Sequence, residues 1–475
     1  MNNTRVYINE LSAHKGEGVL IKGWVHSRRD QGKMIFLDFR DATGVVQGII
    51  LPGSGAMETG KIAREEFVVE VSGKVNDRPG KDKKTDVLNG DLELEILSIT
   101  ILNESAVLPF PISDDSRDIN ESLRLTYRYL DLRNARMQKN IKNRFRVQNF
   151  VRNYLAKENF VEIETPLLSA PTPEGSRSYV VPSRNWKGNF YSLPQSPQQY
   201  KQLLMVGGFE KYFQFARCMR DEDARGDRQP EFTQLDMEMS FISEEDVIDL
   251  NEKLLIALVK ELYPEKTIQQ IPFPRMSYQE AMDKYKTDRP DIRKDPNDPN
   301  LLAFLWIVDF PMFEKTGADN VDGTGEWTFT HNPFSRPRDN DFEKFMRKED
   351  IGEIITTQYD ITLNGLEIGG GSLRNHKSAA LRTTFEIMGY SDERIQNNFG
   401  HMLKALEFGA PPHGGIAWGF DRLIMVLEGE PNIRETIAFA KTSDGKDLIM
   451  DAPTALSKEQ QNELGINIVK DSKEK

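Results

Sequence analysis

The stretch from residue 215 to residue 241, FARCMRDEDARGDRQPEFTQLDMEMSF, has alternating sequence at both ends and a charged middle. Because successive side chains of a β-strand point to opposite faces, the alternation predicts two antiparallel strands joined by the loop 223–230. The returning strand then has a packing face of Leu235, Met237 and Met239 and a polar face of Gln234, Asp236 and Glu238. Arg220 and Glu222 align with the polar face across the hairpin.

Two interpretations of the polar face are open from this stretch alone. The first is a solvated edge hairpin, whose surface ion pairs each contribute under ~1 kcal/mol. The second is a ligand site, because a guanidinium such as that of Arg220 binds phosphate oxygens, while carboxylates bind an ammonium group or Mg²⁺.

A glycine-rich patch downstream favours the ligand site. The stretch 359–376, YDITLNGLEIGGGSLRNH, places Asp360 and Glu367 on either side of a turn, followed by three glycines and Arg374. Consecutive glycines allow the backbone to approach a ligand closely. A β-bulge or a tight strand exit is the structural alternative for these glycines.

A third patch, PPHGGIAWGFDRLIMVL at 411–427, predicts a strand that leads into a helix. Asp421 is positioned to cap the N-terminus of this helix, and Arg422 lies in its first turn. An arginine there opposes the helix dipole, so a bound phosphate explains Arg422 better than helix stability does.

The composition excludes several classes of protein. A chain of 475 residues predicts two or three domains. The net charge of −12 argues against a protein that coats nucleic acid non-specifically, although it permits a local basic groove. A single cysteine excludes a disulfide scaffold and a Cys-based metal site. The N-terminus lacks a signal-peptide pattern and no apolar run approaches ~20 residues, so we expect a cytoplasmic protein without a membrane span.

The chain divides into a strand-rich part and a mixed part. Residues 1–106 contain five short β-rich runs, which predict a small barrel, at 18–27, 34–41, 45–51, 66–75 and 92–102. We interpret residues 107–137 as a hinge. Residues 138–475 predict an α+β domain on a largely antiparallel sheet. It begins with an amphipathic helix at 138–160, whose apolar positions are Phe145, Val147, Val151, Tyr154 and Leu155, followed by a strand at 161–169.

These patches, in this order, resemble the class II aminoacyl-tRNA synthetases that carry an N-terminal OB-fold, and among them most closely the aspartyl type of bacteria. The predicted helix with VEIETPLL and Pro166 resembles motif 1, the dimer-forming element. The hairpin resembles motif 2, and GIAWGFDRLIM resembles motif 3. Further matches are RLTYRYLDLR, LPQSPQQYKQLL, WIVDFPMFE and LEIGGGSLRNH, so that the resemblance covers nearly the whole chain.

The resemblance implies an OB-fold anticodon-binding domain at 1–106 and a class II catalytic domain at 138–475, on an antiparallel sheet flanked by helices. It implies a homodimer that uses ATP and Mg²⁺ to attach L-aspartate to tRNA-Asp through an aspartyl-adenylate. One alternative is an enzyme that also charges tRNA-Asn. Others are an asparaginyl- or lysyl-type synthetase, an inactive tRNA-binding paralogue and an asparagine synthetase. Bacterial aspartyl enzymes usually carry a large insertion near 287–302, where this chain has only a loop.

The resemblance also implies roles for individual residues. Arg220, Glu367 and Arg422 would be catalytic, and Asp360 and Glu367 would bind the metal ion. The ATP-binding set would be Arg220, Glu222, Gln229, Glu367, Gly419, Phe420, Asp421 and Arg422. The aspartate-binding set would be Glu174, Ser196, Gln198, Lys201, Arg220, Asp236, His331 and Arg374. Of these, Lys201, His331 and Arg374 would recognise the side-chain carboxylate, which suits aspartate because a free carboxylate prefers a bidentate arginine and a second cation.

The barrel carries an independent signal for single-stranded nucleic acid. In the run 34–41, Ile35, Leu37 and Phe39 share one face, whereas Phe36 lies on the polar face. An aromatic ring on the polar face of an OB strand is a stacking platform for an unpaired base, although partial burial against a loop is the alternative. Arg29, Phe36 and Gln47 match the anticodon-reading positions of the family.

Overall fold

The computed structural model describes residues 4–80, 83–84, 87–112, 115–171, 174–223, 225–317 and 325–469. The chain separates into two compact units, Met1–Pro111 and Ile112–Lys475. No helix within the described ranges has the length and apolar character needed to cross a membrane.

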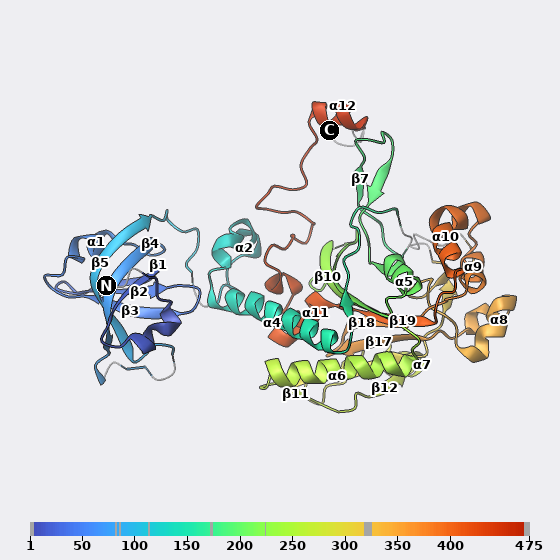
Figure 1. Ribbon diagram of the computed structural model, residues 1–475, viewed down its shortest axis with the longest axis horizontal. Helices are drawn as coiled ribbons and strands as arrows, with labels where there is room; N and C mark the ends of the chain where they lie inside the picture. The colour runs from blue at the N-terminus through green and yellow to red at the C-terminus, as the bar shows by residue number, and fades with distance from the viewer. Residues whose placement is uncertain are drawn as a thin grey trace. The chain divides into compact units, whose positions relative to one another are not determined.

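The first unit is a closed five-stranded barrel with the strand order β1-β2-β3-β5-β4 (Figure 1). Its elements are η1 Ile8–His14, β1 Gly18–Asp30, β2 Ile35–Arg40, β3 Val45–Ile50, α1 Met57–Ile62, β4 Val68–Asp77 and β5 Leu92–Asn103. Burial alternates along β2, where Ile35, Leu37 and Phe39 are buried and Phe36 is half-buried. The predicted barrel and the predicted faces of this strand are therefore confirmed.

The second unit is built on an eight-stranded sheet with the order β12-β14-β17-β18-β19-β10-β9-β6. Its strands are β6 Val161–Glu162, β9 Lys211–Met219, β10 Glu231–Ser240, β12 Arg275–Ser277, β14 Phe304–Val308, β17 Gln358–Leu363, β18 Leu366–Leu373 and β19 His413–Gly419. Neighbouring strands are antiparallel except for the pairs at the two edges, β12–β14 and β6–β9. The prediction of a largely antiparallel sheet is confirmed.

Small two-stranded ladders lie outside this sheet. They are formed by β7 Val180–Pro182 with β8 Phe190–Ser192, β11 Thr267–Ile268 with β13 Leu301–Leu302, and β15 Phe313–Lys315 with β16 Trp327–Phe329. The helices of the unit are α2 Glu121–Thr126, α3 Arg128–Asp131, α4 Ala135–Lys157, α5 Gln198–Val206, α6 Glu244–Leu262, α7 Tyr278–Tyr285, α8 Phe342–Arg347, α9 Ser378–Ile387, α10 Asp392–Leu406, α11 Phe420–Glu428 and α12 Lys458–Leu464. Short 3-10 turns are η3 Asp339–Asp341, η4 Ile351–Glu353 and η5 Ile433–Thr436.

The strand predicted at 161–169 is much shorter in the structure. β6 contains two residues, Val161 and Glu162, paired with β9 at the sheet edge. The ladder ends soon afterwards because Pro166 has no N–H to donate and restricts the residue before it. The prediction was therefore wrong in length, although the strand exists.

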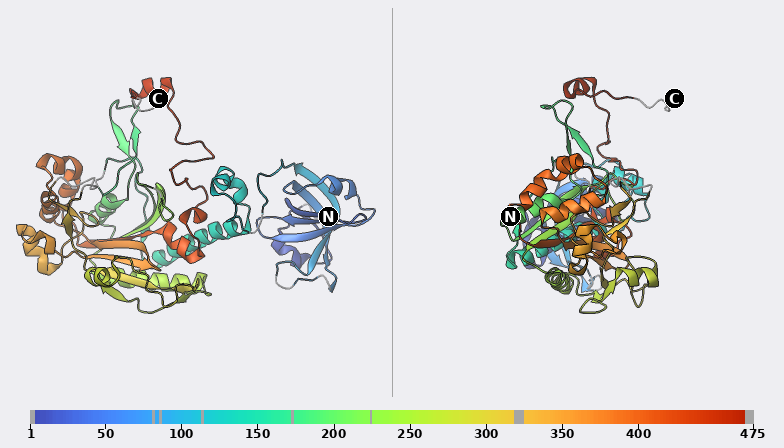
Figure 2. Two further views of the ribbon diagram at one scale, coloured as in Figure 1. Left: turned by 180° about the vertical axis from the view of Figure 1, so that it is seen from behind. Right: turned by 90° about the vertical axis from the view of Figure 1, so that its right-hand side faces the viewer.

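One face of the sheet packs against α4, α6 and α11, and α6 runs beneath it (Figures 1 and 2). Leu235, Met237 and Met239 of β10 belong to this core, as predicted. From α4 the buried residues Val147, Val151 and Leu155 join it at intervals of four. Phe145 was expected on the same face but is 65% exposed. It precedes Val147 by two residues, and residues two apart lie on roughly opposite sides of a helix.

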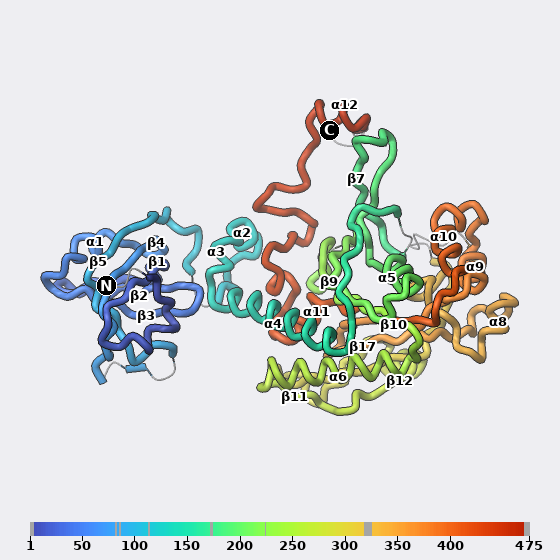
Figure 3. Tube along the Cα trace, viewed as in Figure 1, coloured from blue at the N-terminus to red at the C-terminus, as the bar shows by residue number. Residues whose placement is uncertain are grey.

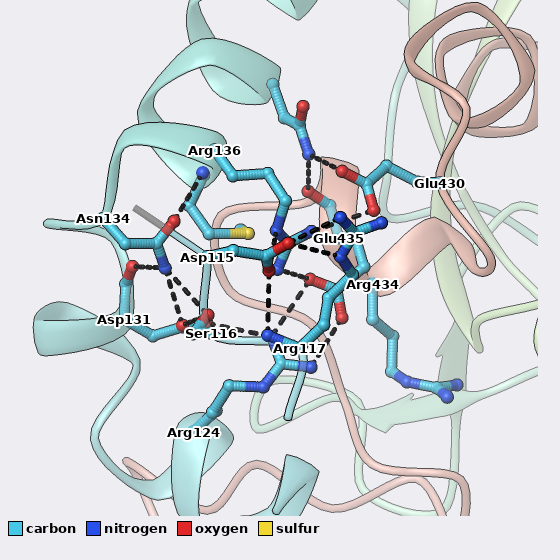
Figure 4. Close-up of polar contacts among 12 residues, drawn as sticks. Asp115, Ser116, Arg117, Arg124, Asp131, Asn134, Arg136, Glu430, Arg434 and Glu435 are labelled. Carbon is cyan, nitrogen blue, oxygen red and sulfur yellow. Dashed lines mark hydrogen bonds and ion pairs between the residues drawn. The ribbon is translucent and has the colours of Figure 1, made fainter. Parts of the chain in front are cut away.

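A buried network of charges ties α2, α3 and α4 to the chain that follows α11 (Figure 4). The backbone path of these helices is drawn in Figure 3. Glu435, 2% exposed, accepts hydrogen bonds from Arg124 at 2.7 Å and from Arg136 at 2.8 Å. Glu430 accepts from Arg136 at 2.8 Å and from Asn140 at 2.7 Å. The predicted hinge at 107–137 thus contains α2, α3 and the start of α4, and ion pairs hold these helices to the chain after α11.

The pKa of Glu435 predicts an acid sensitivity of this network. Burial favours the neutral acid, but Arg124 and Arg136 outweigh it and lower the pKa to about 2. A carboxyl whose pKa is depressed by folding contributes stability above its unfolded value, and this stability is lost as the pH falls through the folded value. Between about pH 4.5 and 2 we therefore expect the wild type to lose about 3 kcal/mol more than Glu435→Gln. Urea unfolding at a series of pH values measures this difference, and parallel curves for the two proteins would contradict it.

Candidate active site

The quoted hairpin has the predicted alternation but lies inside the sheet. β9 and β10 pair so that Gln214 faces Asp236 and Cys218 faces Phe232. Because β10 lies between β9 and β19, its polar face is not at an edge. Asp236 is 1% exposed and Glu238 is 0% exposed, so the solvated hairpin is excluded.

A pocket opens between this hairpin and the start of α11. It is lined by Arg220, Glu222, Asp223, Asp227, Arg228, Gln229, Phe232, Gln234, Glu367, Ala417, Gly419, Asp421, Arg422 and Ile433. Seven of the eight residues assigned to ATP binding from the sequence line it, namely Arg220, Glu222, Gln229, Glu367, Gly419, Asp421 and Arg422. Ile433 carried no signal in the sequence. Alternation places Phe232 as well as Gln234 on the polar face of the hairpin, and Asp223, Asp227 and Arg228 belong to its loop 223–230.

Two predictions about the start of α11 need correction. Phe420 is fully buried and packs edge-on against Phe215 at 5.1 Å between ring centroids, so its ring does not line the pocket. Asp421 is the second residue of α11 and does not cap the helix. Its carboxylate instead accepts from the Thr233 N–H at 2.7 Å and pairs with Arg144, so that it joins the hairpin, α4 and α11.

The arginines of the pocket differ in their partners. Arg228 pairs with Glu222 at 3.2 Å, and Arg422 pairs with Asp227 at 3.1 Å. The guanidinium of Arg220 lies over the Phe232 ring at 5.2 Å and donates to the carbonyl of Gln195 at 3.4 Å. Among the described residues no carboxylate forms an ion pair with Arg220, so this cation is the one available to an anionic ligand.

A cluster of four buried charges lies on the polar face of β10. Lys201 from α5 contacts Asp236 at 2.8 Å and Glu238 at 3.2 Å. Arg374, directly after β18, donates to both oxygens of Glu238, at 2.9 and 3.1 Å. The structure therefore brings three predicted aspartate-binding residues together and adds Glu238, which the sequence assigned to the same face but not to the site.

The two carboxylates of this cluster have opposite pKa shifts. Burial raises the pKa of Asp236 to about 6 despite its contact with Lys201. Burial also opposes ionisation of Glu238, but Arg374 and Lys201 prevail and lower its pKa to about 2. Each cation is thus already partnered, and an incoming carboxylate has to share Lys201 and Arg374 with the two acids.

The remaining residues assigned to aspartate lie around this cluster. Ser196 donates to Glu174 at 2.6 Å, and both line a second pocket with Gln199 and His401. Gln198 is buried and donates to Gln202 at 3.1 Å.

His331 lies elsewhere in the site than predicted. Its Nε2 is 3.9 Å from the Asp360 carboxylate, so it accompanies the acidic pair rather than Lys201 and Arg374.

Asp360 on β17 and Glu367 on β18 form that acidic pair. Burial and then the charge of Glu367 raise the pKa of Asp360 well above its ordinary value. Gly370 faces Asp360 across the ladder, and a Cβ there would lie 2.5 Å from the Asp360 Oδ1. The glycines thus make room for a neighbouring side chain and strand. No group of three or more metal-binding side chains occurs in the described ranges.

The three residues assigned to the anticodon meet on the barrel surface. Arg29 on β1 donates to Gln47 on β3 at 3.1 Å, and its guanidinium is 5.7 Å from the centre of the Phe36 ring on β2. The Arg29 side chain is 55% exposed. Together they present a ring, a cation and an amide on one patch of the barrel.

The buried cluster predicts a strong dependence of stability on Glu238. Glu238→Gln leaves Lys201 and Arg374 short of one negative charge in the interior, and breaking such a buried pair costs about 3–5 kcal/mol. Glu231→Gln on the same strand is the matched control, because Glu231 and Arg217 are each 43% exposed and such a pair contributes under about 1 kcal/mol. Urea unfolding of both variants tests this, and equal losses would contradict it.

Comparison with known protein families gives two matches. A family model described as class II tRNA synthetases (D, K and N) matches residues 120–443. A model described as an OB-fold nucleic acid binding domain matches residues 19–102.

Curated relatives cover nearly the whole chain. The aspartate--tRNA(Asp/Asn) ligase of Thermoanaerobacter sp. (strain X514) is 37% identical over 575 aligned positions, covering 95% of each protein. The aspartate--tRNA ligase of Lysinibacillus sphaericus (strain C3-41) is 38% identical, covering 97% of this chain and 98% of that protein. Since this chain has 475 residues, at least 100 of the 575 aligned positions have no counterpart in it, which agrees with an absent insertion.

Solved structures share the fold at lower identity. The asparaginyl-tRNA synthetase of Pyrococcus horikoshii, complexed with asparaginyl-adenylate, superimposes with a TM-score of 0.75 at 22% identity, covering 93% of this chain and 98% of that one. A putative aspartyl-tRNA synthetase from Leishmania major has a TM-score of 0.74 at 21% identity, covering 92% and 94%.

Proposed function

Because the chain belongs to the class II tRNA synthetases of the D, K and N group, we propose that it attaches L-aspartate to tRNA at the expense of ATP. The observation that carries this proposal is the position of Arg220, a cation without an acidic partner among the described residues, in the pocket beside the Lys201–Asp236–Glu238–Arg374 cluster.

Aspartate is activated in the first step. Its α-carboxylate oxygen attacks the α-phosphorus of ATP, the bond to the β-phosphate oxygen breaks, and pyrophosphate leaves with the electron pair. Arg220 neutralises the charge that develops on the α-phosphate, and Arg422 contacts the departing phosphates. No general base is needed, because the attacking carboxylate is already ionised.

The aminoacyl group then moves to tRNA. A hydroxyl of the terminal ribose attacks the adenylate carbonyl, and the ester forms as the bond between the carbonyl carbon and the phosphate oxygen breaks. AMP leaves with that electron pair, and its phosphate takes up the hydroxyl proton. Glu222 and Gln229 contact the nucleotide through both steps.

The buried cluster selects the amino acid. Arg374 binds the side-chain carboxylate of aspartate, and Lys201 supplies the second cation. Asp236, Glu174 and Ser196 accept from the substrate ammonium group. A lysine substrate would place a third cation against Lys201 and Arg374, which disfavours it.

The acidic pair suits a magnesium ion. Mg²⁺ is usually bound by one or two carboxylates together with substrate phosphates, and Asp360 and Glu367 supply two. Burial and the charge of Glu367 raise the pKa of Asp360, and a cation bound between the two carboxylates would offset both effects. When bound, the ion would neutralise phosphate charge, and Asp360 and Glu367 would hold it.

Recognition of tRNA begins at the barrel, where Phe36 stacks on an anticodon base and Arg29 and Gln47 contact its neighbours. Relatives named for tRNA(Asp/Asn) and relatives named for tRNA alone are similar to this chain at nearly equal identity, 37% and 38%. Identity therefore does not distinguish an enzyme that charges tRNA-Asp alone from one that also charges tRNA-Asn, and a charging assay with both tRNAs decides between them.

Charging assays test this assignment. Purified protein should aspartylate tRNA-Asp, and the same assay with tRNA-Asn determines the range. Phe36→Ala and Arg29→Ala should each lower kcat/KM for tRNA by about 10- to 100-fold, since stacking of one base contributes about 1–3 kcal/mol. Both variants should keep aspartate-dependent ATP–pyrophosphate exchange.

The matched control is Tyr7→Ala, because Tyr7 also lies under an arginine on the barrel, with Arg5 at 4.5 Å. Equal loss of charging and exchange in the Phe36 variant, or an effect of Tyr7→Ala as large, would contradict the anticodon assignment.

We also propose a homodimer through the outer face of α4. Phe145 is 65% exposed and borders a groove between α4 and α6 that includes Phe150, Tyr154 and Leu262. The rest of its lining is mostly polar, and exposed apolar groups rimmed by polar residues are typical of an interface. The sequence of α4 resembles motif 1, the dimer-forming element of the family.

Sedimentation velocity tests the dimer. The wild type should sediment at about twice the 54.4 kDa mass of the chain, and Phe145→Glu should shift it to the monomer. Phe408→Glu is the control, because Phe408 is 74% exposed but lies outside this groove. A monomeric wild type would sink the proposal.

A further inference from the structure

The loop 225–229, one wall of the ATP pocket, is held by the chain that follows α11. The N–H of Ile433 donates to the carbonyl of Gly226 at 2.9 Å, and the N–H of Lys441 donates to the Gln229 Oε1 at 2.8 Å. Gln229 and Ile433 both line the pocket. The segment 432–441 therefore supports this wall, together with Arg422, which holds Asp227.

That segment has little regular structure of its own. Between the end of α11 and the start of α12 the described chain contains one helical element, the four-residue turn η5. Arg128 of α3 donates to the carbonyls of Ile437 at 2.9 Å and Ala438 at 3.0 Å. Arg124 and Arg136 hold the Glu435 side chain, as Figure 4 shows.

Glu435 is the group on which these contacts converge. Its two carboxylate oxygens accept from Arg124 at 2.7 and 3.0 Å, and one of them also accepts from Arg136 at 2.8 Å. Asn140 of α4 donates to its backbone carbonyl at 3.1 Å. A charge-assisted set of this kind fixes both the side chain and the backbone of one residue.

We propose that Glu435 is a positioning residue for ATP: with Arg124, Arg128 and Arg136 it fixes the segment 432–441, and this segment places the loop 225–229 against the nucleotide. Glu435 lies outside the pocket lining and acts only through its neighbours. The inference rests on the proposed function, because that function makes ATP the ligand of the pocket.

The position of the segment 432–441 depends on the negative charge of Glu435. A glutamine presents one oxygen and an NH₂ group, so it cannot accept all three of the hydrogen bonds from Arg124 and Arg136, and its NH₂ group would face an N–H group of an arginine. In this variant Arg124 still pairs with Asp131 at 3.4 Å, and Arg136 still pairs with Glu430. Both arginines therefore keep an acidic partner, while their hydrogen bonds to residue 435 weaken. The loop 225–229 then samples positions away from the nucleotide, and bound ATP has to reorder it.

ATP–pyrophosphate exchange by the full-length chain tests the proposal. With aspartate saturating, Glu435→Gln should raise the KM for ATP by about tenfold, while the KM for aspartate stays within twofold. Titration of ATP in the absence of aspartate should show a matching rise in Kd. Glu435→Asp keeps the charge with a shorter reach, so its ATP KM should lie between those of the wild type and Glu435→Gln.

The control is Glu428→Gln, at the C-terminal end of α11. The Glu428 side chain is as buried, at 0% exposed, and accepts from Tyr263 at 2.7 Å and Asn143 at 3.0 Å. Its hydrogen bonds lead to α4 and to Tyr263 rather than to the segment 432–441. Its ATP KM should therefore remain within twofold of the wild type, whatever it costs in stability.

Three results would overturn the proposal: an unchanged ATP KM in Glu435→Gln, equal rises in the KM for ATP and for aspartate, or an equal ATP effect in Glu428→Gln. If Glu435→Gln does not fold, Glu435→Asp decides, with at least a threefold rise in ATP KM supporting the proposal and none opposing it. Absence of exchange in the wild type would instead reject the proposed function itself.

Discussion

The central constraint in the catalytic unit is the burial of opposite charges on one strand, β10. Asp236 and Glu238 are almost inaccessible to solvent, and they are tolerated there because Lys201 and Arg374 reach them from α5 and from the end of β18. Buried ion pairs rarely improve stability over well-packed apolar residues. Their retention on a strand whose other face is an ordinary hydrophobic core is best explained by a charged ligand.

The same β10 organises the neighbouring pocket. The N–H of Thr233 donates to Asp421, which pairs with Arg144 of α4, so Asp421 joins the hairpin, the long helix and the start of α11. Arg220 and Arg422 are thereby held on opposite walls of the pocket, one from the hairpin and one from the helix. The pocket that we propose for the nucleotide and the cluster that we propose for the amino acid both adjoin β10, which suits a reaction between two bound substrates.

Local patterns predicted much of this arrangement. Alternation in 231–240 separated the core residues from the polar face, and the five β-rich runs gave the barrel, because both signals depend only on neighbours in the sequence. The predictions that failed concern side chains whose position depends on partners far away in the sequence. Asp421 looked like a helix cap because its partner Arg144 is 277 residues away, and the pairing of Arg124 with Glu435 spans 311 residues. Phe145 was assigned to the core by counting apolar residues, although its angular position on α4 places it outside.

The claim that the buried cluster selects the substrate is tested most directly by ATP–pyrophosphate exchange with L-aspartate and with L-asparagine. The two amino acids have nearly the same shape and differ in the negative charge that Lys201 and Arg374 are placed to share. The account predicts robust exchange with aspartate and a kcat/KM at least 100-fold lower with asparagine. Equal exchange with both, or a preference for asparagine, would contradict it.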